Sequence, residues 1–435
     1  MRVALLVDNP DRDLPGLALV AERIAAAGAV AYLVPMNLAE PELSGLAPHL
    51  ALLTYLRRTN EALAARLAAA GIGLAVLDTE GGVMEDFAAY QRVMARERAT
   101  RFAVRRFLAW GPRLGAAARA EGWYRPEAVR VTGNPRFDLY APPWREAAAR
   151  AAPAGVGLPE PVVLVAGTYT LANPRFGTPE AERRMLIEEL GLDPAFVDRR
   201  LDCERRGLHG MAELANRLAA ERPGATFVLR PHPFEGDAAY RELLDGAPNL
   251  HLGRDGAIAP WLLRARALVQ RGSTTAIEAA LAGVPALSAL WLPSWARLEA
   301  VEAASVPCPD PETLLARLDR ALAEPPPTGP PVAAAPLIEE WFSTADGRAH
   351  ERVAGELLGA ASEGENPDVR ACRELHYRPA EGAGAAARAA RLRRALRLPR
   401  GFSFRRLREL PPRPGWERSG KAFDAASVQR WTDAV

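Results

Sequence analysis

The chain has 435 residues, a length that suits two α/β domains and an appendage better than one compact core. Hydrophobic residues make up 49% of it and charged residues 25%, a globular composition that excludes wholesale disorder. The net charge is only +2, and Lys421 is the only lysine. We therefore attribute the many arginines to genomic GC bias and exclude nucleic acid as a partner.

The three cysteines, Cys203, Cys308 and Cys372, are widely spaced and form no paired motif. This spacing argues against a disulfide framework and a zinc site, and for a reducing compartment. No run approaches about 18 uninterrupted apolar residues, and residues 2–8 resemble a strand rather than a signal peptide. These features predict a cytoplasmic protein that neither spans a membrane nor is exported.

Residues 1–140 alternate short apolar runs with alanine-rich helical stretches, the pattern of a doubly wound parallel sheet. The strands are expected at 3–7, 30–34, 50–54, 73–77, 107–110 and 129–132. The helices are expected at 16–27, 60–70 and 113–121, with Gly28 and Gly71 just past the first two, where helices prefer to end.

Residues 141–160 are rich in Ala, Pro and Gly and are predicted to form a hinge. A second α/β series follows over 161–330, with strands at 161–166, 226–230, 267–270 and 286–290, and helices at 210–221 and 274–282. We therefore expect two Rossmann-like doubly wound domains facing a cleft. Residues 331–435 are expected to be a helical C-terminal extension.

The extension contains a strongly basic segment. Residues 385–408 hold nine arginines and no acidic residue, with leucines interleaved, which suggests a basic amphipathic helix up to Pro399. Such a helix could contact the inner face of the cell membrane peripherally, or it could be a solvated helix that covers the domains. Both interpretations stay open at this point.

A phosphate site is predicted at Gly272, Ser273, Thr274 and Thr275, directly after the strand expected at 267–270. The glycine allows a tight turn, and Ser or Thr at a helix start leaves hydroxyl and backbone N–H groups aimed at one point. A plain helix cap is the alternative. The combination of strand, glycine turn and helix favours phosphate binding.

Another strand, at 226–230, ends in Arg230 and is followed by His232 between two prolines. Proline restricts the backbone and has no N–H group, so the imidazole is held in one orientation at the carboxyl end of the strand. Ligands of open α/β sheets bind at that edge. We expect Arg230 and His232 to contact a phosphate, with His232 supporting a departing nucleotide.

In the first domain, the strand at 73–77 runs into Asp78, Glu80 and Gly81. Carboxylates on a glycine turn at a strand end could supply a general base, although acidic turns are common. Two further turns are expected on the cleft face. They contribute Thr168 and Asn173 to the nucleotide site, and Asn134, Arg136 and Asp138 to the cleft.

Together these segments resemble bacterial surface-polysaccharide glycosyltransferases of the B fold that use CMP-activated sugars, including sialyltransferases, polysialyltransferases and Kdo transferases. The matching segments, in the order of that group, are Asp78-Thr79-Glu80-Gly81, His232-Pro233 and Ser273-Thr274. Residues 133–138 and 171–173 also resemble surface carbohydrate biosynthesis proteins. In one departure, Thr79 stands where the sialyltransferases have their catalytic base, which leaves Asp78 and Glu80 as rival candidates.

The resemblance covers roughly residues 1–350 and implies a nucleotide-sugar domain at 161–330 and an acceptor and catalytic-base domain at 1–140. The expected partners are a nucleotide sugar and a glycan or glycolipid acceptor. Neither a cofactor nor a metal is expected, since the sequence offers no metal-binding carboxylate cluster. Inversion and retention both remain open.

Other functions share the fold. One is a phosphotransferase for CDP-linked polyols, and another is a non-catalytic nucleotide-sugar-binding assembly protein. A nucleotide-sugar epimerase is less expected, because Asp8-Asn9-Pro10 follows the first strand instead of the Gly-Thr-Arg-Pro-Glu loop of hydrolysing epimerases.

Overall fold

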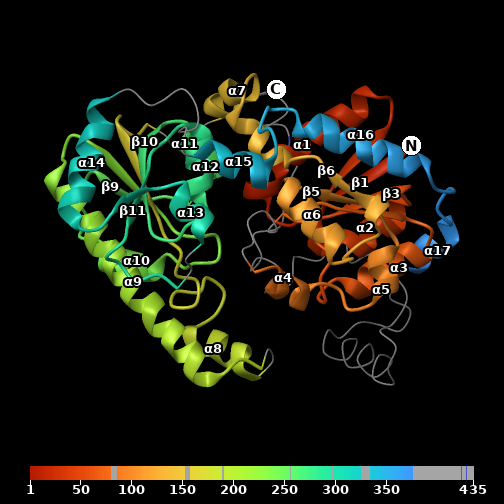
Figure 1. The fold of residues 1–435 in the computed structure, drawn as a ribbon, viewed down its shortest axis with the longest axis horizontal. Coiled ribbons are helices and arrows are strands. Elements are labelled where there is room, and N and C mark those ends of the chain that lie inside the picture. Colours follow the sequence, from red (N-terminus) through yellow and green to blue (C-terminus); the bar gives the residue numbers. More distant parts are fainter. Residues whose placement is uncertain are drawn as a thin grey trace, which may run out of the picture.

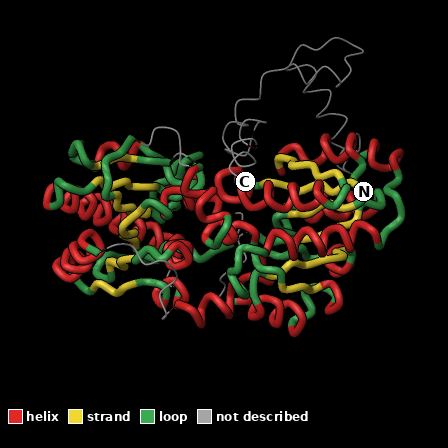
Figure 2. Tube along the Cα trace, turned by 90° about the horizontal axis from the view of Figure 1, so that it is seen from above, coloured by secondary structure: helices red, strands yellow, loops and turns green. Residues whose placement is uncertain are grey.

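The computed structural model describes residues 1–79, 86–151, 157–188, 191–254, 256–295, 298–324 and 334–375, together with Phe423 and Val428. Two α/β halves lie side by side, each built around a six-stranded sheet (Figures 1 and 2). Within the described residues, no helix combines the length and the apolar character needed to cross a membrane. The arginine-rich segment 385–408 lies outside the described residues, so its contact with a membrane stays a prediction.

The sheet of the N-terminal half is parallel throughout, in the order β2-β1-β3-β4-β5-β6. Its strands are β1 (Arg2–Val7), β2 (Val30–Pro35), β3 (Leu50–Leu53), β4 (Gly73–Val76), β5 (Val104–Ala109) and β6 (Val129–Val131). The central strands β3 and β4 are buried along their whole length, as a parallel sheet covered by helices on both faces requires. All six strands were predicted from the sequence.

The helices of this half include α1 (Pro10–Ala26), α2 (Ala39–Leu46), α3 (Glu61–Ala69), α4 (Phe87–Val93), α5 (Arg98–Phe102) and α6 (Pro112–Ala120). Helix α1 begins six residues before the predicted start at Gly16. The side chain of Asn9 accepts hydrogen bonds from the backbone N–H groups of Asp11 and Arg12, at 3.1 and 3.3 Å. This cap, with Pro10 in the first turn, explains the earlier start.

The sheet of the C-terminal half is also parallel, in the order β12-β11-β10-β7-β8-β9. Its strands are β7 (Val162–Ala166), β8 (Thr226–Arg230), β9 (Leu250–Leu252), β10 (Ala265–Gln270), β11 (Ala286–Ala289) and β12 (Val306–Cys308). The edge strands β9 and β12 were not predicted. Each has only three residues, and neither shows the β-branched alternation of the equally short β6, because β9 contains no β-branched residue and β12 contains Pro307.

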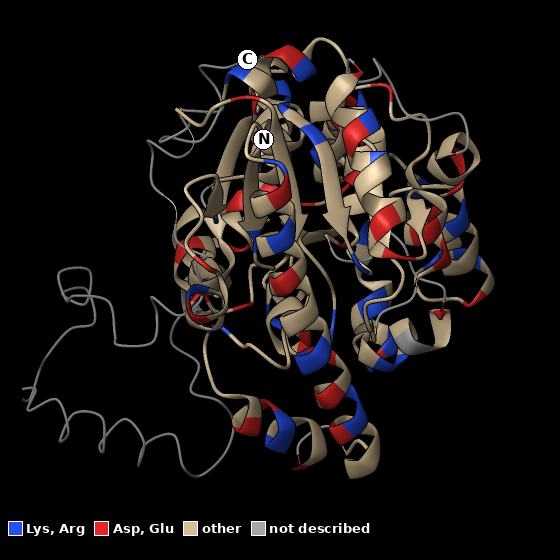
Figure 3. Cartoon of the chain, turned by 90° about the vertical axis from the view of Figure 1, so that its left-hand side faces the viewer, with Lys and Arg blue, Asp and Glu red and all other residues tan. Residues whose placement is uncertain are grey.

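The helices of this half are α8 (Pro179–Glu188), α9 (Pro194–Glu221), α10 (Ala238–Leu243), α11 (Ile258–Leu262), α12 (Thr275–Ala282), α13 (Glu299–Ala303) and α14 (Pro311–Ala323). In Figure 1, α8 lies beside the lower end of the long helix α9. Figure 3 views the molecule from the side of this half and shows acidic and basic residues interspersed along its helices.

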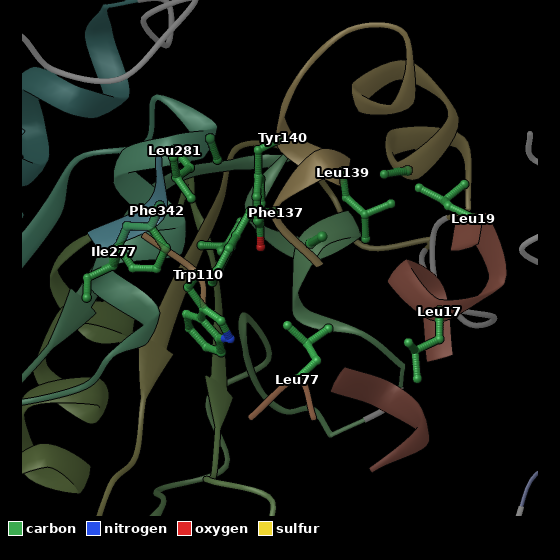
Figure 4. Packing of buried hydrophobic residues seen from close by; sticks show 14 of the residues in the cluster. Leu17, Leu19, Leu77, Trp110, Phe137, Leu139, Tyr140, Ile277, Leu281 and Phe342 are labelled. Carbon is green, nitrogen blue, oxygen red and sulfur yellow. The ribbon is translucent and has the colours of Figure 1, made fainter. Parts of the chain in front are cut away.

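The two halves share an apolar core. It includes Trp110 at the end of β5, Phe137 in the 3-10 helix η3 (Pro135–Tyr140), and Ile277 in α12 (Figure 4). The Phe137 ring meets Trp110 edge-on at a centroid distance of 5.2 Å and Phe342 at 4.7 Å. Segment η3 therefore lies at the junction between the two halves. The predicted hinge, residues 141–160, contains helix α7 (Trp144–Arg150), and this helix contacts α11 of the C-terminal half.

The helices expected in the C-terminal extension are α15 (Ala335–Phe342), α16 (Ala349–Ser362) and α17 (Val369–Glu374). All three return to the N-terminal half, where α15 contacts α6, α16 contacts α1, and α17 contacts α2. The blue helices in Figure 1 show this return. The described part of the extension is thus a structural layer of the N-terminal half.

Candidate functional site

Three adjacent strands of the C-terminal half place most of the predicted nucleotide-binding residues together. Strand β7 lies between β10 and β8, so the loops after these strands meet at one edge of the sheet. The backbone N–H of Gly167 donates to the backbone carbonyl oxygen of Arg230 at 3.0 Å. The side-chain hydroxyl of Thr168 donates to the backbone carbonyl oxygen of Arg271 at 3.2 Å. These bonds join the three loops directly.

The predicted phosphate loop follows β10. Gly272 has a φ of +73°, a left-handed conformation that favours glycine, and the chain then enters α12. The buried amide of Ser273 donates to the side-chain oxygen of Gln270 at 2.8 Å, and the Ser273 hydroxyl accepts the N–H of Thr275 at 3.3 Å. Thr274 is exposed and its side chain makes no capping bond, so it faces the solvent at the helix start.

Sequence reasoning missed the residues that hold this loop. The side-chain amide of Gln270 donates to Ser305 at 3.1 Å. The buried guanidinium of Arg271 donates to the carbonyl of Leu292 at 3.0 Å and to the Glu302 carboxylate at 2.5 Å. Because their partners lie 21 to 35 residues further along the chain, no local pattern could have identified them.

His232 lies in the loop after β8, where the side chain is half-buried. The backbone N–H of Phe234 donates to its Nδ1 at 3.2 Å. Since Nδ1 acts as an acceptor, a neutral imidazole carries its proton on Nε2. Nε2 is then the nitrogen that can donate a hydrogen bond to an anionic ligand.

Arg230, at the end of β8, is partly buried and is held in place by neighbouring groups. Its Nη2 donates to the carbonyl oxygen of Gly256 at 3.0 Å, and its guanidinium lies over the Trp261 ring at 5.2 Å from the centroid. The residue therefore fixes the loop between β9 and α11, and its positive charge stays at the carboxyl edge of the sheet. Its direct contact with a phosphate remains a prediction.

Asn173 lies beside a cavity next to the site. Its side-chain amide donates to the carbonyl of Gly236 at 2.7 Å, joining the loop after β7 to the loop after β8. The adjoining cavity has a volume of about 580 Å³, and Asn173, Arg175, Asp237 and Arg254 are among its lining residues. A cavity of this size and polarity can hold a small polar ligand.

In the N-terminal half, Asp78 follows β4 and is only 1% exposed. Its carboxylate lies 3.3 Å from the guanidinium of Arg57 and accepts the Tyr90 hydroxyl at 2.8 Å. Burial, followed by the charge of Asp78, raises the pKa of Tyr90 well above its usual range. The surroundings of Asp78 thus suit a structural ion pair. The rival acid Glu80 and the adjacent Gly81 lie outside the described residues.

A charged cluster that sequence reasoning missed lies next to Asp78. Arg12 in α1 donates to Thr79 at 2.9 Å and to Asp13 at 2.6 Å. A small recess runs past these groups, lined by Asp13, Thr79, Asn134 and Arg136 among others. Asn134 and Arg136 therefore line the same recess as Thr79, which belongs to the predicted acidic turn.

Arg136 also reaches the C-terminal half. Its Nη2 lies 3.5 Å from the carboxylate of Glu278 in α12, and its guanidinium stacks over Phe137 at 4.7 Å. The side-chain oxygen of Asn134 accepts the backbone N–H of Arg136 at 3.0 Å and so caps η3. Arg136 thus contacts the C-terminal half directly, and Asn134 fixes the start of the segment that carries Arg136.

Asp138, expected in the cleft, is instead 1% exposed and faces α16. Its carboxylate accepts the backbone N–H groups of Ala349 and His350, at 2.9 and 2.7 Å, and contacts His350 Nδ1 at 2.8 Å. Placing Asp138 in the cleft was therefore wrong. Asp138 instead caps the first turn of α16, which is more than two hundred residues further along the chain.

No protein-family model matches the chain, and no curated protein matches it. Solved structures match its fold. A putative UDP-N-acetylglucosamine 2-epimerase from Listeria monocytogenes has a TM-score of 0.53 at 14% identity, over 84% of this chain and 98% of its own. The UDP-GlcNAc 2-epimerase from Neisseria meningitidis bound to UDP-GlcNAc has a TM-score of 0.52 at 14% identity, over 82% and 100%.

The wall teichoic acid polymerase TagF is also similar, with a TM-score of 0.51 at 12% identity, over 83% of this chain and 89% of its own. Identities this low show the fold alone. The structural similarity and the two parallel six-stranded sheets confirm the prediction of a two-domain α/β fold of the glycosyltransferase B type.

Proposed function

We propose that the protein is an enzyme that acts on a nucleotide sugar, and more specifically a glycosyltransferase. The observation that carries this proposal is the meeting of residues 272–275, Thr168 and His232 at the carboxyl edge of three adjacent parallel strands. Ligands of such sheets bind at this edge, and a glycine turn entering a helix suits a phosphate. The names of the similar structures, two epimerases of UDP-GlcNAc and a teichoic acid polymerase, support a nucleotide-linked substrate.

In the proposed reaction, the bond between the sugar carbon and the donor's phosphate oxygen breaks, and a bond to the acceptor hydroxyl oxygen forms. Ser273, Thr274 and the start of α12 would hold the phosphate. The Nε2–H of His232 would donate to the leaving oxygen as negative charge develops on it, a form of electrostatic stabilisation by fixed donors. The chain's own residues thus provide the charge stabilisation.

The proton of the acceptor hydroxyl would pass to a carboxylate of the N-terminal half. Asp78 and Glu80 remain the two candidates from the sequence. The contacts of Asp78 with Arg57 and Tyr90 suit a structural role, so we propose Glu80 as the carboxylate that reacts. The Asp78→Asn and Glu80→Gln variants separate the two assignments, since only the catalytic substitution abolishes turnover without loss of folding.

We propose a CMP-activated sugar, a nonulosonic acid or Kdo, as the donor and a surface glycan or glycolipid as the acceptor. This finer proposal rests on the resemblance of Glu80-Gly81, His232-Pro233 and Ser273-Thr274 to the CMP-sugar transferases. A UDP-sugar epimerase is the second candidate, because two of the similar structures carry that name. A CDP-polyol phosphotransferase would use the same phosphate loop.

The test is a thermal-shift screen of the purified chain against CMP, CDP, UDP and GDP. A ligand at 100 times its Kd stabilises the folded state by about 2.7 kcal/mol, which raises Tm by a few degrees. We expect CMP to give the largest shift and His232→Ala to abolish it. His209→Ala is the matched control, because His209 is an exposed residue of α9 and its loss should leave the shift unchanged.

Each other result of the thermal-shift screen would favour a different function. A preference for UDP with interconversion of a UDP-sugar would replace the transferase with an epimerase, and a preference for CDP would favour the phosphotransferase. Binding without turnover of any donor would favour an assembly protein. The absence of a shift with all four nucleotides would overturn the nucleotide-sugar proposal.

A further inference from the structure

We propose that Glu235 and Arg254 are positioning residues that clamp the backbone of His232 from both sides and thereby fix the direction of its imidazole. This inference rests on the proposed function for the role of His232, although the clamp itself is tested without any assay of turnover. Neither residue belongs to a motif found in the sequence, and both lie within the loops that follow β8 and β9.

Glu235 holds the peptide group that precedes His232. The side chain is 0% exposed, and its Oε2 accepts the backbone N–H of His232 at 2.6 Å, while its Oε1 accepts the Tyr240 hydroxyl at 2.9 Å. A buried carboxylate is costly unless hydrogen bonds satisfy it, so the loop must keep the N–H of His232 directed at this carboxylate. The peptide plane before His232 is therefore fixed.

Arg254 holds the peptide group that follows His232. Its Nη1 donates to the carbonyl oxygen of His232 at 3.0 Å, and its Nη2 donates to that of Glu235 at 2.6 Å. Asp237 orients the guanidinium by accepting from its Nε at 2.9 Å. The planar fork of arginine matches two carbonyl groups at once, which a lysine could not reproduce.

The clamp is transmitted to the imidazole through the turn itself. The N–H of Glu235 donates to the carbonyl of His232 at 2.8 Å, so the four residues from His232 to Glu235 form a closed turn. Within this turn the N–H of Phe234 reaches Nδ1 of His232. Any rotation of the clamped peptides would move this donor away, and the ring would lose its fixed tautomer and direction.

The loop after β7 approaches the Glu235 carboxylate closely at Gly167. A Cβ atom at Gly167 would lie 2.6 Å from Oε2 of Glu235 and 2.4 Å from the hydroxyl oxygen of Tyr240. Gly167 thus allows the loop after β7 to approach both groups more closely than a larger residue would. Glu235 consequently couples the position of His232 to the loop that carries Thr168.

The experiment is ¹⁵N NMR of the full chain labelled at histidine, at a pH where the imidazoles are neutral. The chain has only six histidines, and the signals lost in His232→Ala identify those of His232. We expect the native ring to populate the Nε2–H tautomer almost fully. In Glu235→Ala and Arg254→Lys, the tautomer populations should shift toward those of a free histidine.

Tyr240→Phe is the matched control. It removes the second hydrogen-bond donor to the same carboxylate but leaves the bond to the His232 backbone, so the tautomer of His232 should remain native. Glu235→Gln provides a near-isosteric variant if Glu235→Ala does not fold, and an intermediate shift is expected because one amide oxygen replaces two carboxylate oxygens. Unchanged His232 signals in the folded Glu235 and Arg254 variants would overturn the clamp.

Kinetics then connects the clamp to the proposed function. If His232 supports the departing phosphate, its misplacement in Glu235→Ala should lower kcat about 10²-fold while the donor KM changes far less. A shifted tautomer with unchanged kcat would keep the clamp and reject the role of His232. An unchanged tautomer with lowered kcat would reject the clamp alone.

Discussion

Glu235 buries its carboxyl group beside His232, and this burial raises its pKa from 4.5 to about 7, against the hydrogen bonds from His232 and Tyr240 that lower it. The folded chain therefore binds this proton more tightly than the unfolded chain. Its contribution to stability is fully present below pH 4.5 and is lost as the pH rises through 7. The shift corresponds to roughly 3 kcal/mol in the free energy of unfolding.

Replacing Glu235 with glutamine should remove this dependence. Denaturant unfolding of the native chain and of Glu235→Gln, measured between pH 4.5 and just above 7, isolates the titration of this residue because the other groups cancel. We expect the native chain to lose on the order of 3 kcal/mol relative to the variant over this interval. Parallel curves for the two proteins would show that Glu235 titrates as an ordinary carboxyl group.

Asp78 allows a second prediction at the same scale. Asp78→Ala should lower the free energy of unfolding by about 2 kcal/mol, because it leaves the buried hydroxyl of Tyr90 without its acceptor and removes the ion pair with Arg57. The matched control is Asp86→Ala. Asp86 forms an exposed ion pair with Arg92, whose loss should cost no more than about 0.5 kcal/mol. Equal costs in urea unfolding would contradict a structural role for Asp78.

At the scale of elements, the capping of α16 by Asp138 gives the third prediction. Asp138→Ala should destabilise the chain by about 2 kcal/mol, since two buried N–H groups of the first turn lose their acceptor. Amide hydrogen exchange should accelerate most in α16. Asp368→Ala provides the comparison, because Asp368 caps α17 in an exposed position and its removal should cost only about 1 kcal/mol. Unchanged exchange in α16 would contradict this role.

The same scale shows why some elements were predicted and others were missed. Strand β8 was predicted with its observed ends, because a buried parallel strand is a short apolar run. Helix α9 begins sixteen residues before the predicted Gly210, since Gly207 and Gly210 resemble breaks in the helix. A Cβ at Gly207 would lie 2.5 Å from the ring of Tyr169, so this glycine serves close packing rather than a turn.

The candidate site divides in a similar way. Gly272 and Ser273 could be predicted as candidates because a strand, a glycine turn and a helix start follow one another, and His232 because two prolines flank it after a strand. The residues that hold these candidates in place could not be predicted from the sequence. Glu235 and Arg254 are separated by 19 residues and Gln270 and Ser305 by 35, and such pairs become neighbours only in the folded chain.

At the scale of the whole molecule, helix α12 connects the predicted phosphate loop to the N-terminal half. It starts next to Thr274, and one turn later Glu278 accepts the hydroxyl of Tyr140 at 2.7 Å and lies 3.5 Å from Arg136. Burial, followed by the charge of Glu278, raises the pKa of Tyr140 well above its usual range, so Tyr140 donates this bond at any physiological pH. Glu278 thereby links the helix that follows the predicted phosphate loop to η3.

Because the apolar core is continuous across the junction, we expect both halves to unfold in one transition, and a double-mutant cycle can then measure this connection. Tyr140→Phe should cost about 1.5 kcal/mol, since it leaves one oxygen of the buried Glu278 without its donor. Combined with Glu278→Gln, the two changes should show a coupling energy of about 1 kcal/mol. Additive effects would mean that the Tyr140 hydroxyl adds nothing to the junction through Glu278, and Arg136 would then be the residue through which Glu278 makes its polar contact with the N-terminal half.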